Sequence, residues 1–289
     1  MGITAKQRED RRNYLGSSDV AALFGLNPYM NAFDVWLEKT GQLEPEQQTR
    51  PWLETGNEFE SVILDRAARV LGPLRKNQKR SARDRGLPLA SHIDAIVVES
   101  GRPVEAKTSG LWWPMPEEWG EPGTDEVPDR VVIQAQVHLI VTDQDLCHAP
   151  CMKYGLRQDL YEIPRNDAMV RTITEYCGQW WERHVIEGVE PEGMPSLEIV
   201  RRRKREPGST ADIPDELIER WRRFVTAEGR CRKLKEAALT EVLHAMGDAE
   251  VGVSSLGTVE FVERQRQQKV MPAKVTRSVQ FKKHKPSSN

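Results

Sequence analysis

Apolar and polar positions along the chain alternate with two periods, one typical of strands and one typical of helices. Residues 92–98 are apolar and β-branched apart from one acid, residues 99–102 have the composition of a turn, and residues 103–108 form a second short run. This pattern predicts a β-hairpin. A basic strand is expected over 76–83, and a pair of strands is expected within 145–163.

Helical spacing and capping residues predict the other elements. Ser17 or Ser18 can cap a short helix that ends at Gly25, and Asn31 can cap a helix over 32–40. Longer runs with helical periodicity favour helices over 54–71, 129–141, 166–187 and 215–246.

A stretch rich in proline and glycine, 190–210, indicates a boundary between domains. We therefore predict one domain over 1–190 and an extension over 191–289. The extension is expected to contain a long helix, a hairpin around Gly257 and a basic tail.

Composition narrows the classes of protein. Of 289 residues, 30% are charged and 38% are hydrophobic, and no run approaches the roughly 20 apolar residues that a membrane span needs. The first residues lead into a charged segment and do not resemble a signal peptide. A cytoplasmic protein without membrane contact is expected.

The charge is balanced overall but unevenly distributed. A net charge of −2 argues against a protein that coats DNA with its whole surface. Eight Lys and Arg and no acid follow Glu263, and residues 201–205 are all basic. Such segments often bind phosphate, although a solvated tail explains the last dozen residues equally well.

The first hairpin carries candidate chemistry. With a turn centred on Ser100 and Gly101, Asp94 would lie opposite Lys107 and diagonal to Glu105, with all three side chains on one face. Unpaired charges are costly to bury, and a divalent cation with oxygen ligands would remove that cost. An ordinary surface hairpin with an Asp94–Lys107 ion pair explains the same residues.

The helix starts near the beginning of the chain are candidates for phosphate binding. Free backbone N–H groups, the hydroxyls of Ser17 and Ser18, and the nearby Arg11 and Arg12 suit an anion. Two ordinary capped helices account for the same sequence.

Two stretches together resemble a known family. Asp94 followed by Glu105-Ala106-Lys107 resembles the PD-(D/E)xK nuclease signature. The run LGSSDVAALFGLNPYMNAFDVWLEKTG closely resembles the opening motif of the YqaJ-type viral recombinase family, phage exonucleases that include the lambda exonuclease. The resemblance covers roughly 11–187. It implies an α/β fold with a restriction-endonuclease-like core, in which helices flank a central mixed sheet, followed by a C-terminal helical and β extension.

The resemblance also implies roles for individual residues. Mg²⁺ or Mn²⁺, with two ions per site, would be held by Asp94, Glu105, the carbonyl of Ala106 and Glu60. Lys107 would position or deprotonate the attacking water, and Gln134, in a Q-x-Q pattern after Pro128, would align the scissile phosphate. Where the family commonly has a tyrosine in the first turn of that helix, this chain has Arg130 or Val131. His138 is expected in the core.

Contacts with DNA are expected partly from the same resemblance and partly from the composition of two segments. The 5′-terminal phosphate would be gripped by Arg11, Arg12, Ser17 and Ser18. Residues 110–128 form a long linker whose Trp112 and Trp113 would either stack on a base or pack on the body of the protein. Further DNA contacts are expected from Arg201, Arg202 and Arg203.

The implied function is a Mg²⁺-dependent exonuclease that digests one strand of linear double-stranded DNA from 5′ to 3′. The 3′ single strands would pass to a phage single-strand annealing protein in the cytoplasm of a bacterial host, and a ring-shaped trimer is expected. No iron–sulfur cluster is expected, since Cys147, Cys151, Cys177 and Cys231 lack the cluster pattern of such nucleases. The alternatives are a structure- or site-selective endonuclease on the same scaffold and a catalytically inactive DNA-binding recruitment module.

Overall fold

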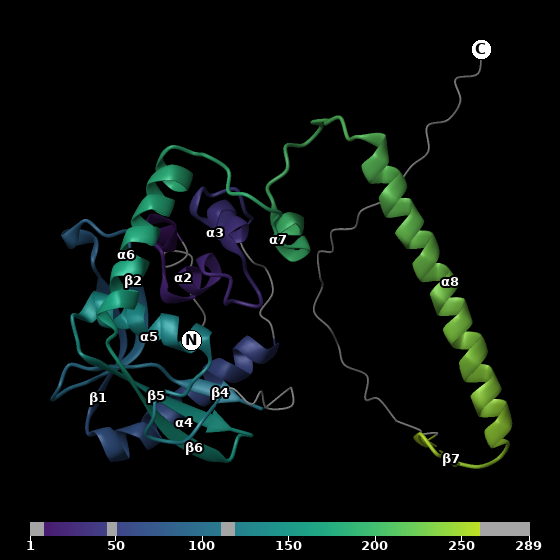
Figure 1. Ribbon diagram of the computed structural model, residues 1–289, viewed down its shortest axis with the longest axis horizontal. Coiled ribbons are helices and arrows are strands. Elements are labelled where there is room, and N and C mark those ends of the chain that lie inside the picture. Colours follow the sequence, from purple (N-terminus) through teal and green to yellow (C-terminus); the bar gives the residue numbers. More distant parts are fainter. Residues whose placement is uncertain (1–8, 45–50, 111–118, 261–289) are drawn as a thin grey trace. The chain divides into compact units, whose positions relative to one another are not determined.

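The computed structural model describes residues 9–44, 51–110 and 119–260, and the chain divides into two compact units, Met1–Lys204 and Arg205–Asn289 (Figure 1). The division falls later than the predicted boundary at residue 190. The reason is that α7 (Leu197–Arg202) buries Ile199 in the core of the first unit. In addition, the Lys204 N–H donates to Gln42 O at 2.9 Å.

The first unit is built on a mixed sheet. β1 (Leu74–Ser81) pairs antiparallel with β2 (Ala90–Val97), which pairs antiparallel with β3 (Pro103–Val104). Both β3 and β4 (Lys107–Ser109) pair parallel with β5 (Leu146–Lys153), whose other edge pairs antiparallel with β6 (Arg157–Pro164). The sheet thus combines a parallel centre with antiparallel edges.

β3 and β4 are two parts of one strand that is interrupted at Glu105 and Ala106. The register against β5 is the same on both sides of the gap. Within the gap the Ala106 N–H donates to the side chain of Asp94, with an N–Oδ2 distance of 2.8 Å. A carboxylate from β2 therefore takes the place of a backbone acceptor, and it lies beside Glu105.

The register of this hairpin differs from the prediction. Ala95 pairs with Val104, so Asp94 is level with Glu105 and not with Lys107. The turn spans 98–101, and Gly101 ends it with a φ of 75°, in the left-handed region that glycine adopts without a steric cost. Because Gly101 closes the turn instead of standing at its centre, the pairing moves by two residues.

Helices cover both faces of the sheet. On one face α4 (Pro51–Leu71) packs Leu64 against Ala95, Val97 and Val104. On the other face α5 (Asp129–Thr142) lies between the sheet and α2 (Ser17–Leu23) (Figure 1). The same side holds α3 (Ala32–Lys39) and α6 (Asp167–Trp180). The helix α6 continues as the π-helical turn η3 (Trp181–Ile186). Short 3₁₀ turns are η1 (Arg11–Asn13) and η2 (Arg83–Arg85).

The helix starts differ from two predictions. α4 begins at Pro51 and not at residue 54, since proline suits the first turn of a helix, where the N–H has no partner. α2 has Gly16 as its N-cap, and the Gly16 N–H donates to Asp19 Oδ2 at 2.8 Å. Neither Ser17 nor Ser18 is the capping residue.

The second unit contains the predicted long helix and hairpin. The helix is α8 (Asp215–Met246), and the hairpin pairs β7 (Val251–Ser254) with β8 (Gly257–Glu260). Apolar side chains of α8, including Phe224 and Leu234, are exposed. Across the described ranges, no helix has the length and apolar character needed to cross a membrane.

Candidate active site

Three predicted residues meet where the central strand is interrupted. Lys107 Nζ donates to Glu105 Oε1 at 2.6 Å, and Asp94 accepts from the Ala106 N–H beside them. Glu105 is buried, whereas Asp94 and Lys107 are half-buried. The alternative of a surface hairpin with an Asp94–Lys107 ion pair is wrong, because Lys107 pairs with Glu105 of its own strand.

The two carboxyl groups have opposite electrostatic environments. Burial raises the pKa of Asp94 well above its ordinary value, and the charges of Glu105 and Glu60 raise it further. Burial also opposes ionisation of Glu105, but contacts with Lys107 and His138 outweigh it and lower the pKa of Glu105. Adjacent acids whose pKa values are pushed apart are typical of catalytic sites.

Lys107 keeps its proton in this arrangement. Burial acts to lower the pKa of Lys107, but the charges of Glu105 and Asp94 outweigh burial and raise it. A protonated lysine donates hydrogen bonds and positive charge and cannot accept a proton.

Glu60 lies on α4, half-buried, in the third turn of the helix. The influence of its charge on the pKa of Asp94 places it within electrostatic reach of the interrupted strand. In the helix predicted over 54–71 Glu60 would lie in the second turn, and the earlier start of α4 places it in the third.

The donor set suits a hard divalent cation. Asp94, Glu105 and the carbonyl of Ala106 supply oxygen, which Mg²⁺ prefers. The repulsion that raises the pKa of Asp94 is one that a cation would relieve. In this structure Lys107 Nζ donates to one oxygen of Glu105. Within the described residues, no three His, Cys, Asp or Glu side chains are grouped closely enough to hold a metal.

One face of α5 lies along this cluster. His138 is buried, and its Nε2 is 2.9 Å from Glu105 Oε2. Arg130, two turns earlier, carries a charge that acts against protonation of Lys107, so it lies near the lysine. Gln134 lies between them at helical spacing and is half-buried.

His138 and Arg130 are the functional candidates that the sequence interpretation missed. His138 was predicted to be a core residue, and it is buried, but its contact is with an active-site acid. The available signal was its four-residue spacing from Gln134. Gln136 has a different role: it bridges Pro164 O and the Asn166 N–H at the β6–α6 junction.

The residues predicted to grip a 5′ phosphate lie around the start of α2. Arg11 Nη2 is 3.8 Å from Asp19 Oδ1, so part of its charge is already used inside the protein. Arg12 is exposed, and Ser17 and Ser18 are half-buried in the first turn of α2.

A cavity lies at the start of the active-site helix α5. It has a volume of about 350 Å³ and is lined by Leu26, just after α2, and by Val127 to Arg130 at the start of α5. Arg130, whose charge acts on Lys107, is thus also part of the cavity wall.

The remaining predicted DNA contacts fall into two groups. Trp112 and Trp113 lie outside the described residues, while Trp119 of the same linker is buried and packs on Tyr161, with ring centroids 5.0 Å apart. Arg202 and Arg203 donate to Glu44 O and Gln42 Oε1, at 3.3 and 3.2 Å. Arg201, which was predicted together with them, is exposed.

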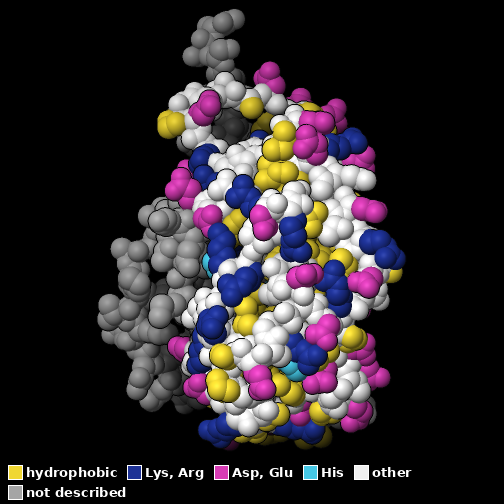
Figure 2. All heavy atoms as spheres, turned by 90° about the vertical axis from the view of Figure 1, so that its left-hand side faces the viewer, with side chains coloured by type: hydrophobic (Ala, Val, Ile, Leu, Met, Phe, Trp, Pro, Cys, Tyr) yellow, Lys and Arg dark blue, Asp and Glu magenta, His cyan; other side chains and the backbone are white. Residues whose placement is uncertain are grey.

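Surface charge is mixed on the face shown in Figure 2, where Lys and Arg side chains are interspersed with Asp and Glu. DNA binding on this face would therefore depend on particular groups and not on a region of one sign.

The four cysteines are free thiols, and Cys147, Cys151 and Cys177 are buried.

The mixed sheet flanked by helices, with two acids and a lysine at an interrupted central strand, defines the PD-(D/E)xK class of α/β fold. Residues 8–145 match the model of the YqaJ-like viral recombinase domain family. This match confirms the resemblance noted in the sequence.

The matches to known proteins cover a large part of this chain. The Bacillus subtilis (strain 168) protein YqaJ is 23% identical over 254 residues, which are 84% of this chain and 78% of that protein. An alkaline exonuclease from Laribacter hongkongensis has 16% identity and a TM-score of 0.48, covering 64% of this chain and 94% of its own. A putative exonuclease from Eubacterium rectale has 13% identity and a TM-score of 0.45, covering 73% and 97%.

Proposed function

We propose that this protein is a metal-dependent deoxyribonuclease of the phage exonuclease type, which digests one strand of linear double-stranded DNA from 5′ to 3′. The observation that carries the proposal is the meeting of Asp94, Glu105 and Lys107 at an interrupted strand within a YqaJ-like domain. Keeping a charged cluster of this kind half-buried costs free energy of folding, so its presence favours a chemical role.

Asp94, Glu105, the Ala106 carbonyl and Glu60 would hold Mg²⁺ or Mn²⁺. When bound, such ions polarise a phosphoryl oxygen and lower the pKa of water. The residues of the chain then have distinct tasks. Lys107, which stays protonated, positions the attacking water and offsets charge on the transition state.

The face of α5 orients the other partners. His138 holds one oxygen of Glu105 so that the carboxylate keeps a single orientation. Gln134 and Arg130 align the scissile phosphate, and Arg130 adds a positive charge from the side of the 350 Å³ cavity.

Polarity would come from recognition of the DNA end. Arg12, Ser17 and Ser18, with Arg11 beside them, would bind the 5′-terminal phosphate. The products are 3′ single strands for a phage annealing protein.

We also propose that the protein forms a ring-shaped trimer. Light scattering on the full chain tests this directly, and a monomeric mass at assay concentration would contradict it.

The decisive experiment follows a linear duplex labelled at the 5′ or the 3′ end, in Mg²⁺ or EDTA. Wild type is compared with Lys107→Ala and with Lys76→Ala, which removes an exposed lysine from the ion pair with Asp65. We expect early release of the 5′ label by wild type and Lys76→Ala, and none by Lys107→Ala or in EDTA, while all three proteins still bind DNA.

Other outcomes point to the alternative functions. Cleavage of closed circular DNA would favour the endonuclease. DNA binding without cleavage in any metal would favour the recruitment module, and its affinity would fall steeply with added salt.

A further inference from the structure

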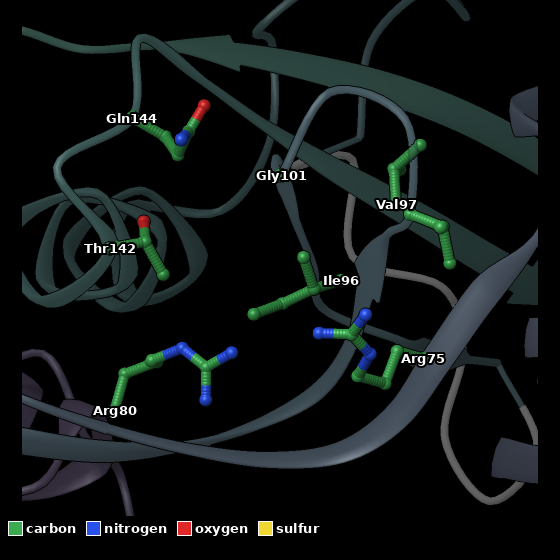
Figure 3. Close-up of a pocket in the computed structure, with 8 residues that line it drawn as sticks. Arg75, Arg80, Ile96, Val97, Gly101, Thr142 and Gln144 are labelled. Atoms are coloured by element: carbon green, nitrogen blue, oxygen red, sulfur yellow. The ribbon is translucent and has the colours of Figure 1, made fainter.

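We propose that a pocket behind the β2–β3 turn is a phosphate-binding site separate from the acidic cluster. The pocket has a volume of about 230 Å³, and its walls come from β1, β2, the turn at Gly101 and the end of α5. In Figure 3 the guanidinium groups of Arg75 and Arg80 point toward each other, with Thr142 and Gln144 on the other side.

Both arginines reach the same pocket because β1 is irregular between them. In a regular strand, residues five apart point to opposite faces. Asn77 lies between them with a φ of 53°, and the pairing of β1 with β2 omits Asn77 and Asp94. A matching break occurs in β2, where Ile93 and Ile96, three apart, both join the core under α5.

The pocket carries positive charge without a counter-ion. None of the residues that line it is acidic, and neither arginine forms an ion pair with a carboxylate of the described residues. The hydrogen bonds of Arg80 are to Lys79 O and Gln78 Oε1, at 3.0 and 3.3 Å, both neutral acceptors within β1. Two facing guanidinium groups repel each other, and an oxyanion bound between them would remove that repulsion.

The negative end of α5 does not account for these arginines. Helix C-termini attract cations through their free carbonyls. Here Ile140 O already accepts from Arg85, and Leu139 O accepts from Arg165 and from the Gln144 N–H. Two carbonyls of the helix end are therefore satisfied by other groups, and neither Arg75 nor Arg80 donates to this end among the described residues.

The shape of the pocket depends on Gly101. A Cβ at this position would lie 3.1 Å from Gln144 Nε2, so a side chain there would displace the amide. With glycine in place, the Gln144 amide can donate to a ligand that the two arginines hold. Planar guanidinium groups and an amide are the donors that proteins use for phosphate oxygens.

The ligand class is thus a phosphate group, supplied either by the DNA backbone or by a small molecule such as inorganic phosphate. None of Asp94, Glu105 and Lys107 lines the pocket, and Asp94 is two positions along β2 from Ile96, the nearest β2 residue of the lining, which corresponds to roughly 7 Å. The two sites are therefore distinct, and either can be tested without the other.

The test compares wild type with the double variant Arg75→Gln/Arg80→Gln. The control, Arg69→Gln/Arg83→Gln, removes the same charge from exposed positions outside the pocket. In the first arm, inorganic phosphate is added at constant ionic strength with chloride. A free-phosphate site predicts a higher thermal midpoint for wild type and control but not for the pocket variant.

The second arm measures binding of linear duplex DNA in EDTA as a function of salt. A backbone-phosphate site predicts that the slope of log K against log salt falls by about one in the pocket variant and stays unchanged in the control. If the pocket variant matches wild type in both arms, the proposal is overturned.

A further measurement needs no substitution. Phenylglyoxal modifies accessible arginines, and mass spectrometry of the wild-type protein reports the extent at each position. Phosphate or DNA should protect Arg75 and Arg80 more than Arg69 and Arg83. Equal modification with and without both ligands would overturn the proposal even if the pocket variant failed to fold. All these readouts measure binding, so they are independent of nuclease activity.

Discussion

Among the buried carboxylates of the first unit, Asp19 lies beside Lys39 and Glu105 lies beside Lys107. The Asp19 pair is deeper, since both side chains are fully buried and their N–O distance is 2.6 Å. It connects η1, α2 and α3, because Lys39 Nζ also donates to Arg11 O. This pair therefore organises the segment that would meet the DNA end.

Acid should weaken the fold through Asp19. Burial alone would raise the pKa of Asp19, but Lys39 and Arg11 outweigh it and hold the pKa below the ordinary 3.8. The resulting stabilisation is fully present above the unfolded-state pKa and is lost as pH falls through the lower folded-state value. We expect the free energy of unfolding, from urea titrations, to decrease as pH falls below about 5.

Substitution of the pair tests the same contact at neutral pH. Asp19→Asn leaves Lys39 buried without its partner and should cost about 3–5 kcal/mol. The double variant Asp19→Leu/Lys39→Met should recover much of that loss, because neither charge of the fully buried pair remains without its partner, and only the longer contact of Arg11 is lost. A single-variant effect within about 0.5 kcal/mol, as at an ordinary surface site, would contradict this account.

His138 should act through Glu105. We expect His138→Leu to reduce cleavage about 10- to 100-fold and to weaken Mn²⁺ binding, measured by electron paramagnetic resonance, because Glu105 loses a partner that orients it. His138→Gln should retain part of both, since an amide can still donate to the carboxylate. Unchanged Mn²⁺ affinity in His138→Leu would show that the histidine only fills space.

At the scale of elements, two irregular strands shape the first unit. The gap between β3 and β4 contains the buried Glu105 and lets the side chain of Asp94 join the backbone hydrogen bonding. Across β2 from this gap, β1 has its own irregular residue, Asn77, at the position level with Asp94. The sheet thus departs from regular geometry on both sides of the same carboxylate, which is common near functional sites.

Asn77 is a test of this irregularity. Because its φ is positive, Asn77→Gly should retain stability, whereas Asn77→Val should cost about 1–3 kcal/mol. The control is Ser81→Val, at the end of the same strand. Chemical denaturation provides the measurement, and equal effects of valine at 77 and 81 would contradict the expectation.

At the scale of the whole molecule, the first unit requires the segment up to Lys204. Ile199 is 5% exposed in the core, the Ser196 N–H donates to Asp34 at 2.8 Å, and Lys204 Nζ donates to Gly41 O at 2.6 Å. The basic block 201–205, which the sequence suggests as a DNA-binding segment, thus also helps to hold α3 in place.

Truncation distinguishes the two boundaries. Residues 1–204 should unfold in one cooperative transition, and residues 1–190 should have a lower thermal midpoint, since they lack the buried Ile199 and the contacts of Lys204. Differential scanning calorimetry of both proteins provides the comparison. Equal midpoints would return the boundary to residue 190.

The sequence by itself determined most of the elements and the family resemblance. The 129–141 helix, the 145–163 strand pair and the 215–246 helix follow from local periodicity and capping, which depend on neighbours along the chain. The acids of the first hairpin and the motif after Tyr14 were also readable, because each is a short pattern with its own spacing.

Only the tertiary structure decided which side chains meet. The contact of His138 with Glu105 joins residues 33 apart, and the one between Asp94 and Ala106 depends on a turn that closes at Gly101. The convergence of Arg75 and Arg80 requires a left-handed Asn77, which alternation in the sequence does not reveal. These features depend on register and packing between distant segments, since a change of register alters which side chains share a face.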